Sequence, residues 1–406
     1  MLAGQVSRMA PRKAVDLEAI KGLSGVGRME GESPTNTTDS KWSDVGPSTK
    51  KRTKTTIDAA NWMKDLDGEL YLSALTIPGT HDSHALVGTP LMPDANTLNP
   101  VKVIMNLAVD WFAKATKAAE CQDWNIATQL QNGVRYFDFR YGDDLRMRHG
   151  QLELPGTLPQ CLKAVSDFLN THPQETVIVM AKWDKWGFID NAGFTEPDTV
   201  RTTADKAFTD LTCFQNVTST PQLKNVRGKI IRKKEGNSTQ GLDFDAAKRD
   251  SKYNQPAFNR PQYQLSNHLS AEQNTWAESF YTIDGVWAQA EHTLNWIRDV
   301  RPKAIAEAVI KDSAETDPNK KTNVTTVNSI WDGTGLNSFR MDLWTILAQS
   351  TLFPVTIAKP TNQKLHKWVE ANCSLAQRYE LGIIQLDFAG SEGTPLLTKL
   401  ILTNFV

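Results

Sequence analysis

Apolar and polar positions alternate in a regular way along the chain from Trp62 onward. Short runs of β-branched and other apolar residues, bounded by turn-forming residues, predict strands. We expect six such strands, at Ser73–Ile77, Val134–Arg140, Thr176–Ala181, Lys229–Lys233, Tyr281–Ile283 and Gly382–Phe388. Amphipathic stretches separate several of these runs, so the pattern is one of alternating strands and helices.

The stretch 158–171 is the clearest predicted helix. Its apolar residues recur at three- and four-residue steps, which places them on one helix face; they are Leu158, Cys161, Leu162, Val165 and Leu169. Strands that alternate with helices predict a parallel sheet. A chain of 406 residues has room for one large domain, and we predict an α/β fold, an irregular (β/α)8 TIM-type barrel.

The first 57 residues differ in composition from the rest. They are rich in Gly, Ser, Thr, Lys and Arg, hold few large apolar side chains and end in the basic stretch Lys50–Lys54. Such a segment cannot bury enough apolar surface to offset the entropy lost on ordering. We therefore expect a disordered tail at 1–57 and a single catalytic barrel at 58–406.

Composition argues against several classes of protein. The formal net charge of -1 creates no overall field that attracts nucleic acid, so we expect no such partner. The four cysteines form no CxxC pair, which argues against a zinc site. No run approaches the roughly 18 apolar residues of a membrane span, and the N-terminus lacks the apolar core of a secretory signal. We expect a cytoplasmic or peripheral membrane protein, with secretion left open.

Two segments carry candidate chemistry. In the first, an apolar strand leads through Pro78-Gly79 to the pair His81-Asp82. In the second, the strand that ends in Arg140 is followed nine residues later by His149. Catalytic groups of a barrel lie at the carboxyl ends of its strands. Two histidines and an arginine there suit cleavage of a phosphodiester by an internal hydroxyl, with one imidazole as base, the other as acid, and the guanidinium on the phosphate oxygens.

Five runs together resemble the X-domain of phosphatidylinositol-specific phospholipases C, of the bacterial, metal-independent type. They are IPGTHDSHA, CQDWNIATQLQNGVRYFDFR, MRHG, LKAVSDFLNTHPQETVIVMAKWD and LGIIQLDFAGSEGTPLLTKLILTNF. The likeness covers about residues 62–188 and the last 30 or so, while the middle of the chain, about 190–345, matches poorly.

The resemblance implies a role for each matched residue. His81 is the general base for the inositol 2-hydroxyl, and His149 is the general acid for the diacylglycerol oxygen. Asp387 pairs with the base, while Asp82 orients the acid and Arg140. The implied reaction releases diacylglycerol and inositol 1,2-cyclic phosphate from a phosphatidylinositol-type lipid, after transient contact with a membrane surface. We expect the protein to act as a monomer.

Arg140 separates this chain from calcium-dependent relatives, which the resemblance implies have a carboxylate at that position. Calcium needs several oxygen ligands, and the matching position on the next strand is Lys182. We therefore expect no metal and no cofactor, with Lys182 in substrate binding. Lys234 is the candidate for a second cation near the substrate. The resemblance also implies an acidic and an aromatic residue that hold the inositol ring; Asp284 and Trp287 lie near the expected place, although their spacing fits poorly.

Two other functions stay open. One is a metal-dependent barrel phosphodiesterase for another glycerophospholipid or a sphingolipid, which would need an acidic cluster after His81 that the sequence does not show. The other is an X-domain that binds lipid head groups without cleaving them. The apolar segment 103–112, which holds Trp111 and Phe112, could dip into a lipid surface, although packing on the barrel is the more common use of such a helix.

Overall fold

The structure, a computed structural model, describes most of the chain from Ile57 to Phe405. The described residues are 57–88, 120–150, 152–184, 195–218, 221–234, 238–242, 333–334, 354–374, 377–390 and 393–405, with isolated positions between 287 and 317. The tail expected before Ile57, the strand expected at Tyr281–Ile283 and the apolar segment 103–112 lie outside them. These three expectations stay predictions.

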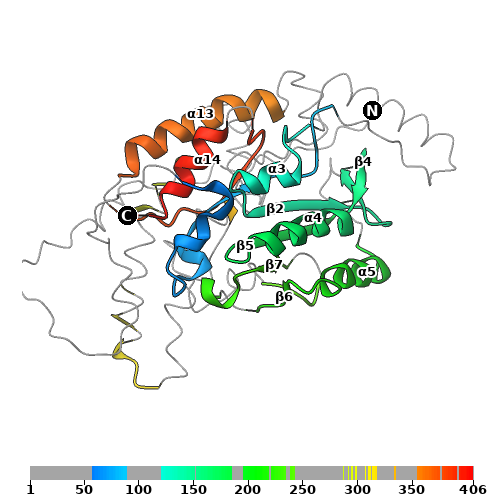
Figure 1. The fold of residues 1–406 in the computed structure, drawn as a ribbon, viewed down its shortest axis with the longest axis horizontal. Coiled ribbons are helices and arrows are strands. Elements are labelled where there is room, and N and C mark those ends of the chain that lie inside the picture. Colours follow the sequence, from blue (N-terminus) through cyan, green and yellow to red (C-terminus); the bar gives the residue numbers. More distant parts are fainter. Residues whose placement is uncertain are drawn as a thin grey trace, which may run out of the picture. The chain divides into compact units, whose positions relative to one another are not determined.

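Parallel strands form the centre of the fold (Figure 1). The sheet has the order β6-β7-β5-β2-β1-β9-β8, and all neighbours along this path run parallel. A hairpin of β3 and β4 is antiparallel and pairs with the end of β2. The strands are β1 (Thr76–Thr80), β2 (Tyr136–Tyr141), β3 (Arg146–His149), β4 (Leu152–Thr157), β5 (Thr176–Trp183), β6 (Phe214–Gln215), β7 (Lys229–Lys233), β8 (Gly333–Thr334) and β9 (Gly382–Leu386).

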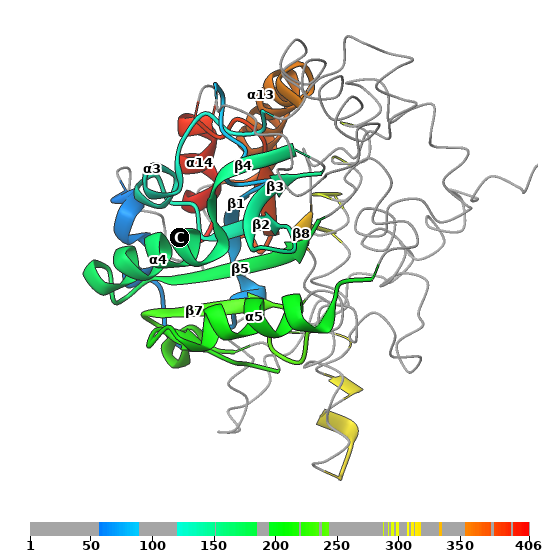
Figure 2. The same ribbon diagram turned by 90° about the vertical axis from the view of Figure 1, so that its right-hand side faces the viewer.

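Helices connect these strands and pack on the outside of the sheet. Figure 2 shows α4 and α5 beside β5 and β7, and α13 packs on α14 near the carboxyl-terminal strand β9 (Figure 1). No helix among the described residues is both long and apolar enough to cross a membrane. The helices are α3 (Ile126–Gln131), α4 (Leu158–Thr171), α5 (Asp198–Thr209), α13 (Pro354–Asn372) and α14 (Gly393–Leu402), with 3-10 turns η3 (Ala59–Asp65), η4 (Leu72–Ala74) and η5 (Leu223–Asn225).

Alternation along the strands produces two apolar layers. Successive strand side chains point to opposite faces. One face of the sheet carries Tyr136, Ile178 and Ile231, which form a buried cluster with Trp62. The opposite face, which includes Val177, Val179 and Ile230, packs with the helices. Because both faces are buried, the strands read as apolar runs, which is the pattern that the sequence shows.

Helix α4 confirms the prediction for 158–171. Its bounds are Leu158–Thr171, and its buried face consists of the predicted apolar positions together with Phe168. Thr157 and Gln160 form a capping box at its start, and Pro159 lies in its first turn. These residues satisfy amide groups that have no partner at a helix start, so the local sequence fixes where α4 begins.

The prediction for the first strand was wrong in its bounds. Leu72–Ala74 is a 3-10 turn, and the strand runs instead from Thr76 to Thr80, through the Pro-Gly pair. A Cβ atom on Gly79 would come within 2.9 Å of the Cβ atom of Tyr136, so glycine here allows two strands to approach closely. The hairpin of β3 and β4 was not predicted at all, because charged residues interrupt its apolar positions.

A buried ion pair joins the segment before β1 to the sheet. Arg135 and Glu175 have fully buried side chains 2.8 Å apart. Glu175 accepts hydrogen bonds from the backbone amides of Met63 and Lys64, and Arg135 donates to the carbonyl of Ala60. The pair therefore bonds β2 and β5 to η3 at the end of the sheet opposite to His81.

Candidate active site

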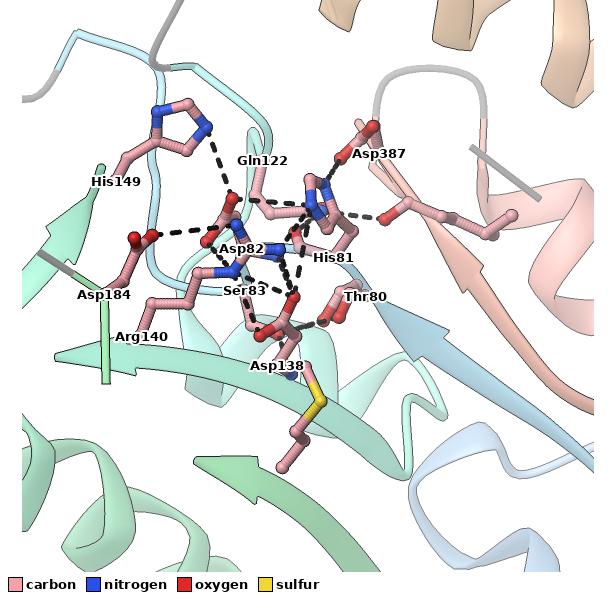
Figure 3. Close-up of polar contacts among 12 residues, drawn as sticks. Thr80, His81, Asp82, Ser83, Gln122, Asp138, Arg140, His149, Asp184 and Asp387 are labelled. Carbon is pink, nitrogen blue, oxygen red and sulfur yellow. Dashed lines mark hydrogen bonds and ion pairs between the residues drawn. The ribbon is translucent and has the colours of Figure 1, made fainter. Parts of the chain in front are cut away.

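His81 and Asp387 lie side by side because the strands before them are in register. Thr80, the last residue of β1, pairs with Leu386, the last residue of β9. The next residue in each chain segment is therefore His81 on one strand and Asp387 on the other. The Nδ1 atom of His81 lies 2.9 Å from Oδ1 of Asp387 (Figure 3). This contact defines the His81–Asp387 dyad.

The dyad fixes the tautomer of His81. Since Nδ1 faces a carboxylate, it carries the proton, and Nε2 keeps its lone pair. The Arg140 Nη2 atom lies 2.8 Å from Nε2 and donates to it. Burial by itself lowers the pKa of His81, but the charges of Asp387 and Asp82 and the hydrogen bond to Asp387 outweigh burial, so the pKa is raised. In its neutral form His81 thus accepts at Nε2, and its basicity is increased.

Arg140 projects from β2 into a group of three carboxylates. Its Nε atom is 2.9 Å from Oδ1 of Asp82, and its Nη2 atom is 3.0 Å from Oδ2 of Asp138. Its Nη1 atom is 3.8 Å from Oδ2 of Asp184. Burial raises the pKa of Asp138, but the charge of Arg140 prevails and lowers it to about 2. The guanidinium therefore stays charged and is held in one orientation.

His149 approaches the same place from the hairpin. It is the last residue of β3, and its side chain is 23% exposed, whereas that of His81 is only 7% exposed. Its Nε2 atom lies 3.2 Å from Oδ2 of Asp82, and Nε2 of His81 lies 3.4 Å from the same oxygen. Figure 3 shows Asp82 between the two imidazoles. Both imidazoles therefore face one oxygen of Asp82, and Arg140 contacts the other oxygen of that carboxylate and His81.

The structure thus brings together the five residues proposed as catalytic from the sequence. These are His81, Asp82, Arg140, His149 and Asp387 (Figure 3). They come from β1, β2, β3 and β9 and the residues that follow these strands. Their catalytic roles stay predictions.

Lys182 lies next to this cluster. It is paired with Arg140 in the register of β5 and β2, so both residues belong to the same face of the sheet. Lys182 is half-buried. Its position fits the predicted contact with substrate, which stays a prediction.

Lys234 fits its predicted role less well than its neighbour. In the strand register, Asp138 on β2 pairs with Met180 on β5, and Met180 pairs with Lys233 on β7. The Nζ atom of Lys233 contacts Sδ of Met180 at 3.6 Å. Lys234 lies just beyond the strand, with its amide bonded to the carbonyl of Leu242. Strand alternation therefore makes Lys233, rather than Lys234, the lysine on the face that carries the site.

The sequence interpretation missed two further residues at this site. Asp184 directly follows β5, binds Arg140 and accepts a hydrogen bond from the amide of Gly150 at 3.1 Å. Its place after an apolar strand is the feature that pointed to His81, so it could have been found. Gln122 donates to the carbonyl of His81, and no strand pattern marks it. Of the acid and aromatic pair sought in the middle of the chain, Asp284 lies outside the described residues.

Two sets of side chains among the described residues have the atoms to contact a metal ion. One is His81, Cys121 and Asp387, and the other is Asp82, Cys121 and His149; within each set the ligand atoms lie within 4.8 Å of one another. Both depend on the buried thiol of Cys121, whose pKa burial raises well above the ordinary value. A metal binds the thiolate, so neither set favours one. The carboxylates that calcium prefers are already bound to Arg140.

No protein-family model matches the chain. The chain is 27% identical over 206 residues to a 1-phosphatidylinositol phosphodiesterase of Listeria monocytogenes, covering 51% of this chain and 58% of that protein. It is 28% identical to a protein of the same name from Staphylococcus aureus, over 42% of this chain and 49% of that one. A human PI-PLC X domain-containing protein 2 is 28% identical over 32% of this chain and 45% of its own. The chain spans about half the length of these curated relatives.

Comparison with solved structures identifies the fold. The phosphatidylinositol-specific phospholipase C from Listeria monocytogenes superposes with a TM-score of 0.52 and 19% identity, covering 86% of this chain and all of that one. This match, with the parallel strands and outer helices described above, confirms the predicted irregular α/β barrel of the TIM type. The resemblance to phosphatidylinositol-specific phospholipases C and their X-domains is confirmed by the same relatives.

Proposed function

We propose that this protein is a phosphatidylinositol-specific phospholipase C. It would cleave phosphatidylinositol-type lipids to diacylglycerol and inositol 1,2-cyclic phosphate. The observation that carries the proposal is the meeting of two imidazoles and one guanidinium around Asp82 at the carboxyl ends of the strands. The relatives named 1-phosphatidylinositol phosphodiesterase support the choice of substrate.

His81 would begin the reaction as the general base. Nη2 of Arg140, 2.8 Å from Nε2 of His81, would turn to the bound phosphate and free this nitrogen. Nε2 then takes the proton of the inositol 2-hydroxyl, and that oxygen forms a new bond to phosphorus. The imidazolium that results is stabilised by Asp387, 2.9 Å from Nδ1. Such a positioned base contributes roughly 10²- to 10⁴-fold to the rate.

His149 would complete the cleavage as the general acid. As the bond between phosphorus and the diacylglycerol oxygen breaks, protonated His149 transfers its proton to that oxygen. Asp82 faces Nε2 of His149 at 3.2 Å and would orient the ring for the transfer. One proton enters at His81 and one leaves at His149, so exchange with solvent restores both residues for the next turnover.

Arg140 would stabilise the charge that develops on the phosphate. Its position beside His81 and Asp82 would allow the guanidinium to contact a non-bridging oxygen of the phosphodiester. It also occupies the carboxylates of Asp82 and Asp138, which would otherwise be available to calcium. The proposed reaction therefore needs neither a metal nor a cofactor.

Two lysines would place the lipid head group. Lys182 pairs with Arg140 in the strand register, and Lys233 lies on the same face of the sheet as Asp138, one strand beyond Met180. Both add positive charge to a site that otherwise contains four carboxylates and one guanidinium. The protein would meet this substrate as a monomer, in transient contact with a membrane surface.

A phosphorus NMR time course on phosphatidylinositol micelles with excess chelator tests the proposal. We expect the lipid signal to decrease while a cyclic phosphate signal grows. A signal that appears only after calcium is restored would assign the chain to the metal-dependent phosphodiesterases. Binding to the micelles without any turnover would show a head-group binding domain, and either result would overturn the proposal.

A further inference from the structure

Gln122 is a fully buried glutamine that bonds to both strands of the dyad. Its Nε2 atom donates to the carbonyl of His81 at 2.8 Å and to the carbonyl of Leu386, just before Asp387, also at 2.8 Å. Figure 3 shows Gln122 next to His81. One carboxamide therefore uses both of its N–H groups on the two chain segments that carry the base and its carboxylate.

These bonds lie where the hydrogen bonding between β1 and β9 ends. The amide of His81 donates to the carbonyl of Leu386 at 3.2 Å, and beyond that point both chain segments turn away. A buried carbonyl needs a partner; Gln122 supplies one to the carbonyl of His81 and adds a second bond to that of Leu386. On the β9 side the backbone carbonyl of Cys121 adds a second bond, from the amide of Phe388 at 2.7 Å.

The backbone immediately after each dyad member is strained. Asp82 has a φ of 39° and Phe388 a φ of 50°, in the left-handed region that residues with a Cβ rarely adopt. Such conformations persist where surrounding contacts determine them, and they concentrate at functional sites. Gln122 makes its bonds within two residues of both strained positions, so it is well placed to hold the two turns.

We infer that Gln122 is a positioning residue that sets the distance and angle between His81 and Asp387. It does not touch the substrate; it acts by joining the carbonyls at the ends of the two strands. The inference rests on the proposed function for its effect on the rate, although the geometry of the dyad can be measured without turnover.

The charges around His81 determine how the effect would be observed. Asp387 faces His81 from β9, Asp82 from its own loop, and Asp138 and Arg140 from β2. Cys121 also lies beside the dyad, and His149 acts on Asp387 through its charge. Of these contacts, only the one with Asp387 links the segment after β1 to the segment after β9, which are the two segments that Gln122 joins. If that contact loosens, His81 loses part of an attraction that favours its protonated form, and its pKa falls.

The test compares Gln122→Met with Asn404→Leu. Methionine has nearly the volume of glutamine but lacks its donors. Asn404 is a matched control, because it is also a buried carboxamide bonded to β1, at Thr76, the opposite end of that strand. For both variants we would measure the melting temperature, kcat and KM against phosphatidylinositol, and the titration of His81 by NMR.

Both variants should lose stability, but only Gln122→Met should alter the dyad. We expect its kcat to fall about tenfold to a hundredfold, with KM within about threefold, and the His81 titration to move to lower pH. Equal effects of the two variants, or an unchanged His81 titration in Gln122→Met, would overturn the inference. If Gln122→Met does not fold, Gln122→Asn provides the same comparison, because its shorter side chain cannot bond both carbonyls. A wild-type protein without turnover would refute the proposed function, while the NMR titration would still test the dyad.

Discussion

At the scale of single residues, charge neutralisation determines what the site can do. Asp82, Asp138 and Asp184 surround Arg140, and together they are buried well enough that an unpaired carboxylate would be costly. The guanidinium offsets that cost and remains beside the two imidazoles. The same contacts that stabilise the buried charges therefore also position the group proposed to bind phosphate.

Removal of either histidine should abolish most of the activity. We expect His81→Ala and His149→Ala each to lose at least about a hundredfold in kcat, because each removes one proton-transfer group. Initial rates on phosphatidylinositol, with circular dichroism to confirm the fold, measure this. His172→Ala is a control, since His172 caps the end of α4 and its imidazole bonds to Thr171 and the carbonyl of Phe168 in that helix. A histidine variant with near wild-type turnover would refute the assigned role.

The pH dependence of kcat/KM should report the basicity of His81. A base acts when neutral, so activity should rise with pH as His81 loses its proton. The pKa of His81 is raised above its ordinary value of 6.5, so the acidic limb should have its midpoint above that value. Asp387→Asn removes the neighbouring negative charge and should shift this limb to lower pH. An unshifted limb in Asp387→Asn would argue against the dyad.

Arg140→Lys should preserve the charge and still impair the enzyme. Lysine cannot contact Asp82 and Asp138 with a planar fork as arginine does. We expect kcat to fall by roughly 10²- to 10³-fold, the usual cost of removing a group that stabilises transition-state charge. Rate measurements at saturating lipid test this. Retention of full kcat would show that only a positive charge is required at this position.

At the scale of elements, the buried ion pair between β2 and β5 contributes chiefly to stability. Arg135 and Glu175 lie at the end of the sheet opposite to the dyad and also bond the backbone of η3. Loss of one partner leaves the other charge buried without compensation. This element therefore offers a test of folding that is independent of catalysis.

Arg135→Met should lower the free energy of unfolding by about 3–5 kcal/mol, because Glu175 would remain as an unpaired buried charge. Denaturant unfolding followed by circular dichroism measures the change. Lys163→Ala is the matched control: Lys163 pairs with Asp167 on the exposed face of α4, and its loss should cost only about 0.5 kcal/mol. Similar losses in the two variants would contradict the importance of burial.

At the scale of the whole molecule, the fold gathers residues from distant parts of the sequence. His81 and Asp387 are separated by 306 positions but occupy adjacent strand ends. Because all of these strands run parallel, their carboxyl ends lie at one edge of the sheet, and catalytic groups collect there. Whole-molecule stability should then be independent of metal, since Arg140 already compensates the charges of the acidic cluster.

Chelator should change neither the melting temperature nor the turnover of the purified protein. A ligand that binds only the folded state raises its stability, so a structural or catalytic metal would be revealed by a lower melting temperature in chelator. Thermal unfolding with chelator and with added calcium measures this. A stabilisation by calcium that Asp138→Asn removes would show that the cluster binds the ion despite Arg140.

Much of the fold and site could be predicted from the sequence because the information is local. Apolar periodicity gave α4 its bounds, since a helix and its capping box depend on neighbouring residues. The strands β2, β5, β7 and β9 were located by their apolar runs. Strand ends pointed to His81 and Arg140, while the resemblance implied Asp387. The β3–β4 hairpin escaped detection because charged residues interrupt its apolar positions.

The sequence by itself determined which residue types are available to the site and where most strands and α4 lie. Only the tertiary structure decided which of those residues meet. Strand register placed His81 against Asp387, alternation favoured Lys233 over Lys234, and Gln122 became a partner of both dyad strands. Register and side-chain contacts between distant segments depend on the packing of the whole chain, and no local pattern encodes them.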